Sequence, residues 1–272
     1  MKSFHVSAWG SDMTELHFVD SHAHIMDADF ANDFDQVIQR TKEKHVDQIM
    51  IITLDQATAE RALAFARKDP KKYVVANGIF PEDIKDVTED TWNRFVEMVK
   101  RPEIKVIGEI GLDYYWESEE IMRAKQREYF IRQIQLANEL HKPFAVHSRD
   151  AMQDTYNIMH AYHGHGLMHC FSGTKEMAVE FTKLGYYLAF GGALTFKNAR
   201  HSVEAVQAVD EKWLLTETDC PYMAPEPVRG TRNEPSNIPY IAQKMAEVRG
   251  TTLEHMSETV SANWNRFLGN DE

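Results

Sequence analysis

The stretch LHFVDSHAH, Leu16–His24, places two histidines directly after a short apolar run. Such a run, ending in polar residues, is typical of a buried β-strand. In an extended strand, residues i and i+2 face the same side and lie about 7 Å apart, so His22 and His24 can point toward one metal ion. Histidine is the commonest metal ligand in proteins. The stretch therefore predicts a strand that ends in two candidate ligands.

Apolar runs of this kind alternate with amphipathic segments along most of the chain. Several runs are rich in Val and Ile with little alternation, as expected for strands covered on both faces. The expected strands are Leu16–Asp20, Gln48–Thr53, Tyr73–Ile79, Lys105–Ile110, Pro143–His147, Gly166–His169, Tyr186–Phe190 and Trp213–Glu217. The expected helices are Asp33–Lys44, Gln56–Lys68, Ile121–His141, Ala151–His160, Lys175–Leu184, Ala199–Ala208, Ile238–Val248 and Leu253–Phe267.

Eight strands with helical crossovers predict an α/β protein with a parallel sheet. Their number favours a closed (β/α)8 TIM barrel, with an open doubly wound sheet as the alternative. No Gly/Ser-rich linker interrupts the pattern, so residues 16–272 are expected to form a single domain after an N-terminal leader, residues 1–15. A length of 272 residues fits one such barrel.

The composition restricts the class of protein. A formal net charge of −12 argues against a protein that coats nucleic acid through a broad basic surface, although divalent cations could supply positive charge within a cleft. The chain has no apolar run of 18 or more residues and no apolar signal core at its N-terminus. Two cysteines do not form a disulfide framework. We therefore expect a cytoplasmic protein without a membrane partner.

Residues of metal-ligand type follow several of the expected strands. In a barrel, the carboxyl ends of the strands converge on one face. The residues placed there are His22, His24, Glu109, His147, His169 and the acids Glu217 and Asp219. Four imidazoles and two or three carboxylates could hold two divalent cations, with one carboxylate bridging them. Mixed ligands of this kind suit Zn, Mn, Fe or Co and leave Mg possible.

Other candidate ligands have a different setting. His163 and His165 repeat the His-x-His spacing but lie between a helix and a strand, a turn expected on the opposite face of the barrel. Cys170 and Cys220 directly follow expected ligands, and strand alternation predicts that the Cys170 side chain points away from the site. We expect both cysteines to be small buried residues rather than ligands.

Three arginines and an aromatic cluster are candidates for substrate contact. Arg149 follows His147 by two residues, while Arg229 and Arg232 flank a glycine in the loop after the last strand, where barrels often bind phosphate. The alternative for that loop is a set of structural salt bridges. Tyr114 and its neighbours at 115–116 follow Glu109 and could stack on a base or sugar, or form the wall of the pocket.

The order of these motifs resembles the TatD family of metal-dependent deoxyribonucleases, a branch of the amidohydrolase-like barrels, over roughly residues 16–268. The resemblance rests on the segments 20–24, 108–114, 147–149, 169–173, 195–199, 217–221 and 229–235. Together and in this order, these motifs are highly specific. One segment departs from the family: where a Gly-x-His-Pro turn is common, this chain reads Gly78-Ile79-Phe80-Pro81.

The resemblance implies a (β/α)8 barrel that hydrolyses phosphodiester bonds in DNA at a divalent-metal centre. The implied ligands are His22, His24, Glu109, His147, His169 and Asp219. In the two-metal hypothesis, His22 and His24 hold the first ion, and His147 and His169 hold the second. Glu109 bridges the two ions. Asp219 binds the first ion and orients or deprotonates the attacking water. Glu217 is expected to support the ligands from behind.

Three functions are compatible with these residues. The first is a deoxyribonuclease that uses two divalent ions and acts as a monomer on DNA or a small phosphodiester. The second is an amidase, deacetylase or lactonase, because the same metals could direct hydroxide to a carbonyl carbon. The third is a metal-stabilised scaffold without catalytic activity. The complete ligand set favours an enzyme.

Overall fold

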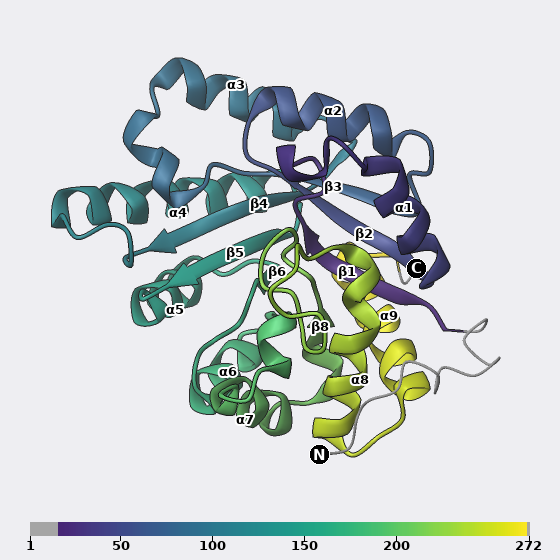
Figure 1. Ribbon diagram of the computed structural model, residues 1–272. Coiled ribbons are helices and arrows are strands. Elements are labelled where there is room, and N and C mark those ends of the chain that lie inside the picture. The colour runs from purple at the N-terminus through teal and green to yellow at the C-terminus, as the bar shows by residue number, and fades with distance from the viewer. Residues whose placement is uncertain (1–15, 271–272) are drawn as a thin grey trace.

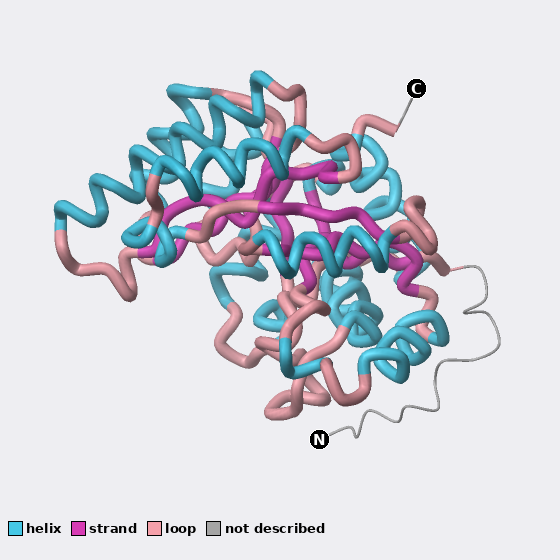
Figure 2. The backbone as a smooth tube through the Cα atoms, turned by 90° about the horizontal axis from the view of Figure 1, so that it is seen from above, coloured by secondary structure: helices cyan, strands magenta, loops and turns pink. Residues whose placement is uncertain are grey.

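The computed structural model describes residues 16–270, so the expected leader lies outside the described residues. Eight parallel strands pair in the order β1 to β8, and the helices surround them (Figures 1 and 2). The prediction of a (β/α)8 barrel is confirmed. The strands are β1 (Phe18–Ala23), β2 (Val46–Thr53), β3 (Tyr73–Asn77), β4 (Ile104–Asp113), β5 (Phe144–Arg149), β6 (Gly166–Met168), β7 (Tyr187–Phe190) and β8 (Leu214–Thr216).

The helices follow the strands in the alternating order that a barrel requires. Their bounds are α1 (Phe34–Glu43), α2 (Gln56–Ala66), α3 (Glu89–Lys100), α4 (Glu120–Glu139), α5 (Met152–Tyr162), α6 (Lys175–Lys183), α7 (Arg200–Ala208), α8 (Ile238–Arg249) and α9 (Leu253–Leu268). Helix α3 was not among the expected helices. Its first turn is stabilised by Thr88, whose side chain accepts a hydrogen bond from the Thr91 N–H.

The barrel closes between β8 and β1. Ala23 and Cys220 form a parallel bridge, and the Asp219 N–H donates to the His22 carbonyl at 2.9 Å. Asp20 adds a side-chain connection: its carboxylate accepts from the Thr218 N–H at 2.8 Å and the Thr218 hydroxyl at 2.6 Å. These bonds fix the backbones that carry His22 and Asp219 against each other.

Strand β4 is longer than expected and irregular at its centre. Its pairing with β5 shifts register between Ile107 and Ile110, and Glu109 lies within this irregular part. A local irregularity in a strand changes the direction in which a side chain points. Glu109 therefore reaches the metal-ligand cluster from the middle of β4 rather than from its end.

The C-terminal helix covers the side of the barrel formed by β1 and β8. Trp264 and Phe267 are fully buried, so one face of α9 packs onto the body of the barrel. The Asn263 amide donates to the carbonyl of Leu214 at 2.7 Å. Within residues 16–270, no helix has the length and apolar character needed to cross a membrane.

Candidate metal centre

Six side chains from five strands or strand ends converge at the carboxyl end of the barrel. His22 and His24 present their Nε2 atoms to each other at 3.2 Å. The Nε2 atom of His22 lies 3.3 Å from Glu109 Oε2, and that of His24 lies 3.5 Å from Asp219 Oδ1. The first histidine pair thus faces one oxygen of Glu109 and one of Asp219.

The second histidine pair approaches the other oxygen of Glu109. His147 Nδ1 lies 2.9 Å from Glu109 Oε1, and His169 Nε2 lies 3.6 Å from the same atom. Asp219 Oδ1 is also 3.8 Å from His169 Nε2. Because its two oxygens face different histidine pairs, Glu109 occupies the position that a bridging ligand requires.

Two further carboxylates hold the second pair of rings in place. Asp113 Oδ2 lies 2.9 Å from His147 Nε2, and Glu217 Oε2 lies 3.0 Å from His169 Nδ1. Carboxylates that contact the far nitrogen of a ligating histidine fix the orientation of its ring. The sequence predicts this role for Glu217. Asp113 was not among the predicted site residues, although it lies four residues after Glu109 in the same strand.

The chemistry of the donor set fits divalent cations. Nitrogen and carboxylate donors of His22, His24 and Asp219 lie within 4.8 Å of one another, as do those of Glu109, His147 and His169. Clusters of imidazoles and carboxylates are typical sites for Zn, Mn, Fe or Co. The six donors would hold the ions in two neighbouring groups, with Glu109 shared between them.

Charges within the cluster are strongly coupled. Burial favours the neutral forms, but the Glu217, Asp219 and Glu109 carboxylates raise the pKa of His169 to about 10. Burial likewise opposes charge on His147, yet hydrogen bonds to Asp113 and Glu109 raise its pKa to about 9. Burial and the His169 charge lower the pKa of His22, whose ring stacks on that of His169 with 3.5 Å between centroids.

We predict that cation binding releases protons at pH 7, among them those of His147 and His169. The pKa values of His147 and His169 in the metal-free fold exceed 7, so both rings must lose a proton before they can bind a cation. Both values also exceed the ordinary histidine value of about 6.5. The protonated rings therefore stabilise the metal-free fold below pH 6.5, and this stabilisation is lost as the pH rises through 9 and 10.

Cation affinity should accordingly rise with pH across the same interval. Isothermal titration calorimetry in two buffers with different ionisation enthalpies measures the proton release directly. A binding enthalpy that does not depend on the buffer would contradict the prediction.

The two cysteines differ in their relation to the cluster. Cys220 is fully buried, as expected, whereas Cys170 is only half-buried. The prediction that Cys170 points away from the site is wrong: its thiol lies within 4.8 Å of donor atoms of His169 and Asp219. Strand β6 ends at Met168 and Cys170 has a φ of 45°, so strand alternation no longer applies there. Burial raises the pKa of this thiol well above its ordinary value, which keeps it neutral.

The rival histidine pair lies elsewhere. His163 follows α5, and His165 Nε2 lies 2.8 Å from the Phe267 carbonyl. Neither histidine belongs to a group of potential metal ligands among the described residues.

The predicted substrate residues are in different environments. The Tyr114 hydroxyl donates to Asp154 at 2.7 Å and accepts from Arg127 at 2.9 Å, so its polar end is already paired. Arg229 lies over the Phe196 ring at 4.0 Å. Arg149 is exposed at the end of β5, close to the cluster. Phe80, at the position of the family's rim histidine, packs edge-on against His147 with 4.9 Å between centroids.

Arg232 is held in a bidentate ion pair. Its two terminal nitrogens donate to the two oxygens of Asp33 at 2.8 and 2.7 Å, and one also donates to the Asp29 carbonyl. These contacts join the β8–α8 loop to the segment before α1. The geometry matches the structural salt bridge that the sequence left open as the alternative.

We predict that Arg232→Gln lowers the melting temperature, whereas Arg229→Gln does not. The first change leaves Asp33 without its bidentate partner. Arg229 is exposed, and its contacts are a loose 3.9 Å ion pair with Glu226 and stacking on Phe196, so its loss should cost little. Differential scanning calorimetry of both variants at low salt checks this. Equal melting temperatures for the two variants would show that the loop does not depend on the Asp33 pair.

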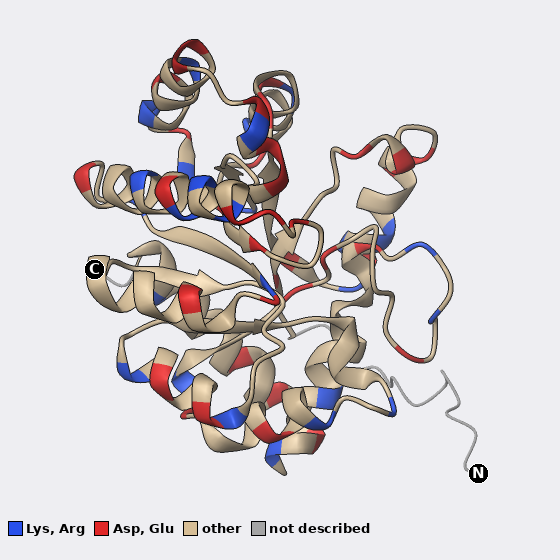
Figure 3. Ribbon diagram, turned by 90° about the vertical axis from the view of Figure 1, so that its left-hand side faces the viewer, with Lys and Arg blue, Asp and Glu red and all other residues tan. Residues whose placement is uncertain are grey.

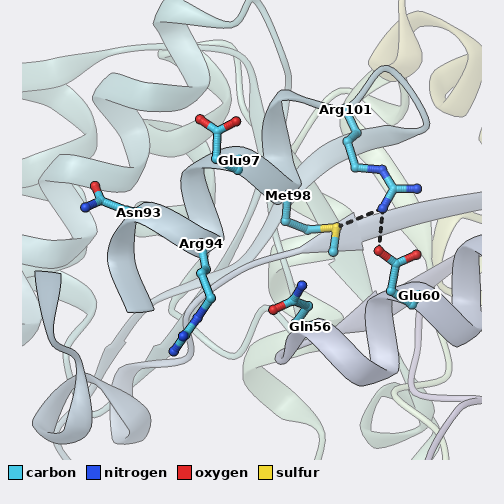
Figure 4. Close-up of a pocket in the computed structure, with 7 residues that line it drawn as sticks. All are labelled: Gln56, Glu60, Asn93, Arg94, Glu97, Met98 and Arg101. Carbon is cyan, nitrogen blue, oxygen red and sulfur yellow. Dashed lines mark hydrogen bonds and ion pairs between the residues drawn. The ribbon is translucent and has the colours of Figure 1, made fainter. Parts of the chain in front are cut away.

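A surface pocket of about 310 Å³ lies between α2 and α3 (Figure 4). Glu60 and Arg101 form an ion pair across it. It contains none of the six predicted ligands. The candidate site is therefore the cluster at the strand ends and not this pocket.

Comparison with known proteins identifies the family of this chain. Residues 19–269 match the family model described as TatD related DNase. The metal-dependent hydrolase YabD of Bacillus subtilis is 37% identical over 252 residues, covering 92% of this chain and 98% of YabD. The hydrolase YcfH of Escherichia coli K12 is 32% identical over 265 residues, covering 93% and 96%.

Solved structures show the same architecture. The TatD homologue YJJV of Escherichia coli superposes with a TM-score of 0.85 at 23% identity, covering 94% of this chain and 98% of that one. A TatD-family hydrolase from Entamoeba histolytica gives a TM-score of 0.81, covering 93% and 98%. The family match over nearly the whole chain shows that this protein belongs to the TatD family of metal-dependent hydrolases.

Proposed function

We propose that this protein is a deoxyribonuclease that hydrolyses phosphodiester bonds with two divalent cations. The observation that carries the proposal is the position of Glu109, whose two oxygens face two separate histidine pairs. The description of the matching family, TatD related DNase, supports DNA as the substrate. His22, His24 and Asp219 would hold one cation, His147 and His169 the other, and Glu109 would contact both.

Bound cations would supply positive charge near the phosphate and would make water acidic enough to act as a nucleophile at neutral pH. Asp219 is placed to accept the proton of that water. In the metal-free fold, burial raises the pKa of Asp219, but His169 and its other histidine neighbours lower it below the ordinary value, so the carboxylate is ionised. As the water oxygen bonds to phosphorus, its proton passes to the Asp219 carboxylate and the bond to the leaving oxygen breaks.

The surface charge is consistent with a local rather than a broad contact to DNA. Basic and acidic residues are interspersed over the helices, and the chain carries a net charge of −12 (Figure 3). A polyanion would therefore depend on the cations and on nearby arginines for attraction. Arg149 is the candidate closest in sequence to the ligands, two residues after His147.

A substrate panel with defined metal content tests the proposal. Protein freed of metal is reloaded separately with Mg, Mn, Zn or Co, and is assayed on end-labelled single-stranded and duplex DNA, on bis-p-nitrophenyl phosphate, and on amide and lactone panels. We expect metal-dependent cleavage of DNA. Turnover confined to amides or lactones would favour the carbonyl hydrolase, and full DNase activity without metal would refute the two-metal account.

A further inference from the structure

Two exposed aromatic side chains lie beside the metal-ligand cluster. Tyr115 and Trp116 follow β4 directly, and 53% and 63% of their respective surfaces are exposed. Their rings meet edge-on at 4.6 Å between centroids. Large aromatic residues at a surface are typical of binding sites, because an unoccupied exposed ring contributes little to stability.

The turn that carries these rings is firmly held. The backbone N–H groups of Tyr115 and Trp116 donate to Asp113 Oδ1 at 3.0 and 3.2 Å. The guanidinium of Arg123 donates to the Glu117 carbonyl at 2.7 Å, which ties the turn to α4. A fixed backbone keeps the two aromatic residues on the surface and lowers the entropy that binding would cost.

Asp113 connects this turn to the predicted ligands. While its Oδ1 atom accepts from the aromatic turn, its Oδ2 atom lies 2.9 Å from His147 Nε2. One carboxylate thus positions both a candidate metal ligand and the exposed rings. A molecule that reaches the cluster through this side of the rim passes Tyr115 and Trp116.

The guanidinium of Arg149 lies beside these two rings and has unused hydrogen-bond donors. The guanidinium carbon of Arg149 lies 3.9 Å from the centroid of the Tyr115 ring and 5.7 Å from that of Trp116. Within residues 16–270, the Arg149 side chain makes no hydrogen bond or ion pair with the protein, whereas Arg127 and Arg232 are paired with carboxylates. Its donors are therefore available for an anionic oxygen.

We propose that Tyr115, Trp116 and Arg149 form a stacking site for the nucleobase next to the scissile phosphate. The inference rests on the proposed phosphodiesterase function and names the form of its substrate. Aromatic faces bind bases of any sequence, and the arginine can contact the neighbouring phosphate. Bases inside a duplex have both faces covered by other bases, so the site selects a single strand or a frayed end.

The test compares an intact single-stranded oligonucleotide with one that has an abasic position beside the scissile phosphate. Binding is measured by fluorescence anisotropy on metal-loaded protein that carries Asp219→Asn to prevent cleavage, and cleavage is measured on metal-loaded protein with Asp219 intact. Loss of base stacking is expected to weaken binding about 5- to 150-fold. The double variant Tyr115→Ala/Trp116→Ala should bind the intact strand more weakly by this same factor. It should therefore bind the intact and the abasic strand equally well.

Two further variants separate stacking from folding and from general exposure. Trp116→Leu keeps apolar bulk without an aromatic face and should lose part of the preference for the intact strand. Tyr162→Ala removes an exposed aromatic residue at the end of α5, on the opposite face of the barrel, and should retain the full preference. A double variant that keeps the wild-type preference for the intact strand would overturn the proposal.

The outcomes distinguish this inference from the proposed function. A wild-type protein that prefers the intact strand but cleaves no phosphodiester would leave the stacking site in place and refute the nuclease. A protein that cleaves DNA and whose double variant binds intact and abasic strands in the wild-type ratio would retain the nuclease and refute the stacking site.

Discussion

Replacement of Asp219 by Asn is expected to lower kcat for DNA cleavage by about 10²- to 10⁴-fold, the range typical of a lost general base. The amide has nearly the shape of the carboxylate but cannot accept the proton of the attacking water. It also removes a negative oxygen from a position 3.5 Å from His24 and 3.8 Å from His169. Single-turnover cleavage assays at saturating metal measure the effect on the chemical step.

The variant Asp47→Asn is a matched control. Asp47 is also an aspartate beside a histidine, because it contacts His17, but it lies near the start of β2, at the opposite end of the barrel. The Asp47→Asn protein should cleave DNA at the wild-type rate. Circular dichroism of both variants checks that the fold is retained. Wild-type kcat in a folded Asp219→Asn protein would remove Asp219 from the mechanism.

The double variant His22→Gln/His24→Gln is expected to lose high-affinity cation binding at one of the two positions. Loss of a residue that merely supports a ligand costs about 10- to 100-fold in metal affinity. Loss of two direct ligands should cost more than this. The remaining donors of that group, Glu109 and Asp219, would hold a cation without nitrogen ligands. Equilibrium dialysis with metal analysis should find one bound ion instead of two.

The rival histidine pair supplies the control for this variant. His163→Gln/His165→Gln changes the same residue types at the same spacing, on a loop outside the cluster. It should bind two cations with wild-type affinity. Equal metal content in the two double variants would contradict the assignment of His22 and His24 as ligands.

Most of the fold could be predicted from local sequence patterns. Strands buried on both faces produce continuous apolar runs, rich in Val and Ile in β2 and β3, and each of the eight strands overlaps a predicted one. Helix α3 was overlooked although Trp92, Phe95 and Val99 recur at helical spacing and are buried. The end of β1 was placed three residues early, at Asp20 instead of Ala23, because polar residues that face a site look like the end of a strand.

The candidate site was predictable to the extent that it depends on strand ends. His147 lies two residues before the end of β5 and His169 directly follows β6, close to the strand ends where the sequence placed them. Asp113 lies beyond the predicted end of β4 at Ile110, and the position of the Cys170 thiol depends on a positive φ, which no periodic pattern records. The pairing of Arg232 with Asp33, 199 residues away, depends on how the loops meet in space.

Anomalous X-ray diffraction from crystals soaked in Mn²⁺ tests the central claim most directly. The account predicts two manganese peaks, one among His22, His24 and Asp219 and one between His147 and His169, with Glu109 in contact with both. A single peak, or peaks only outside these six side chains, would contradict it.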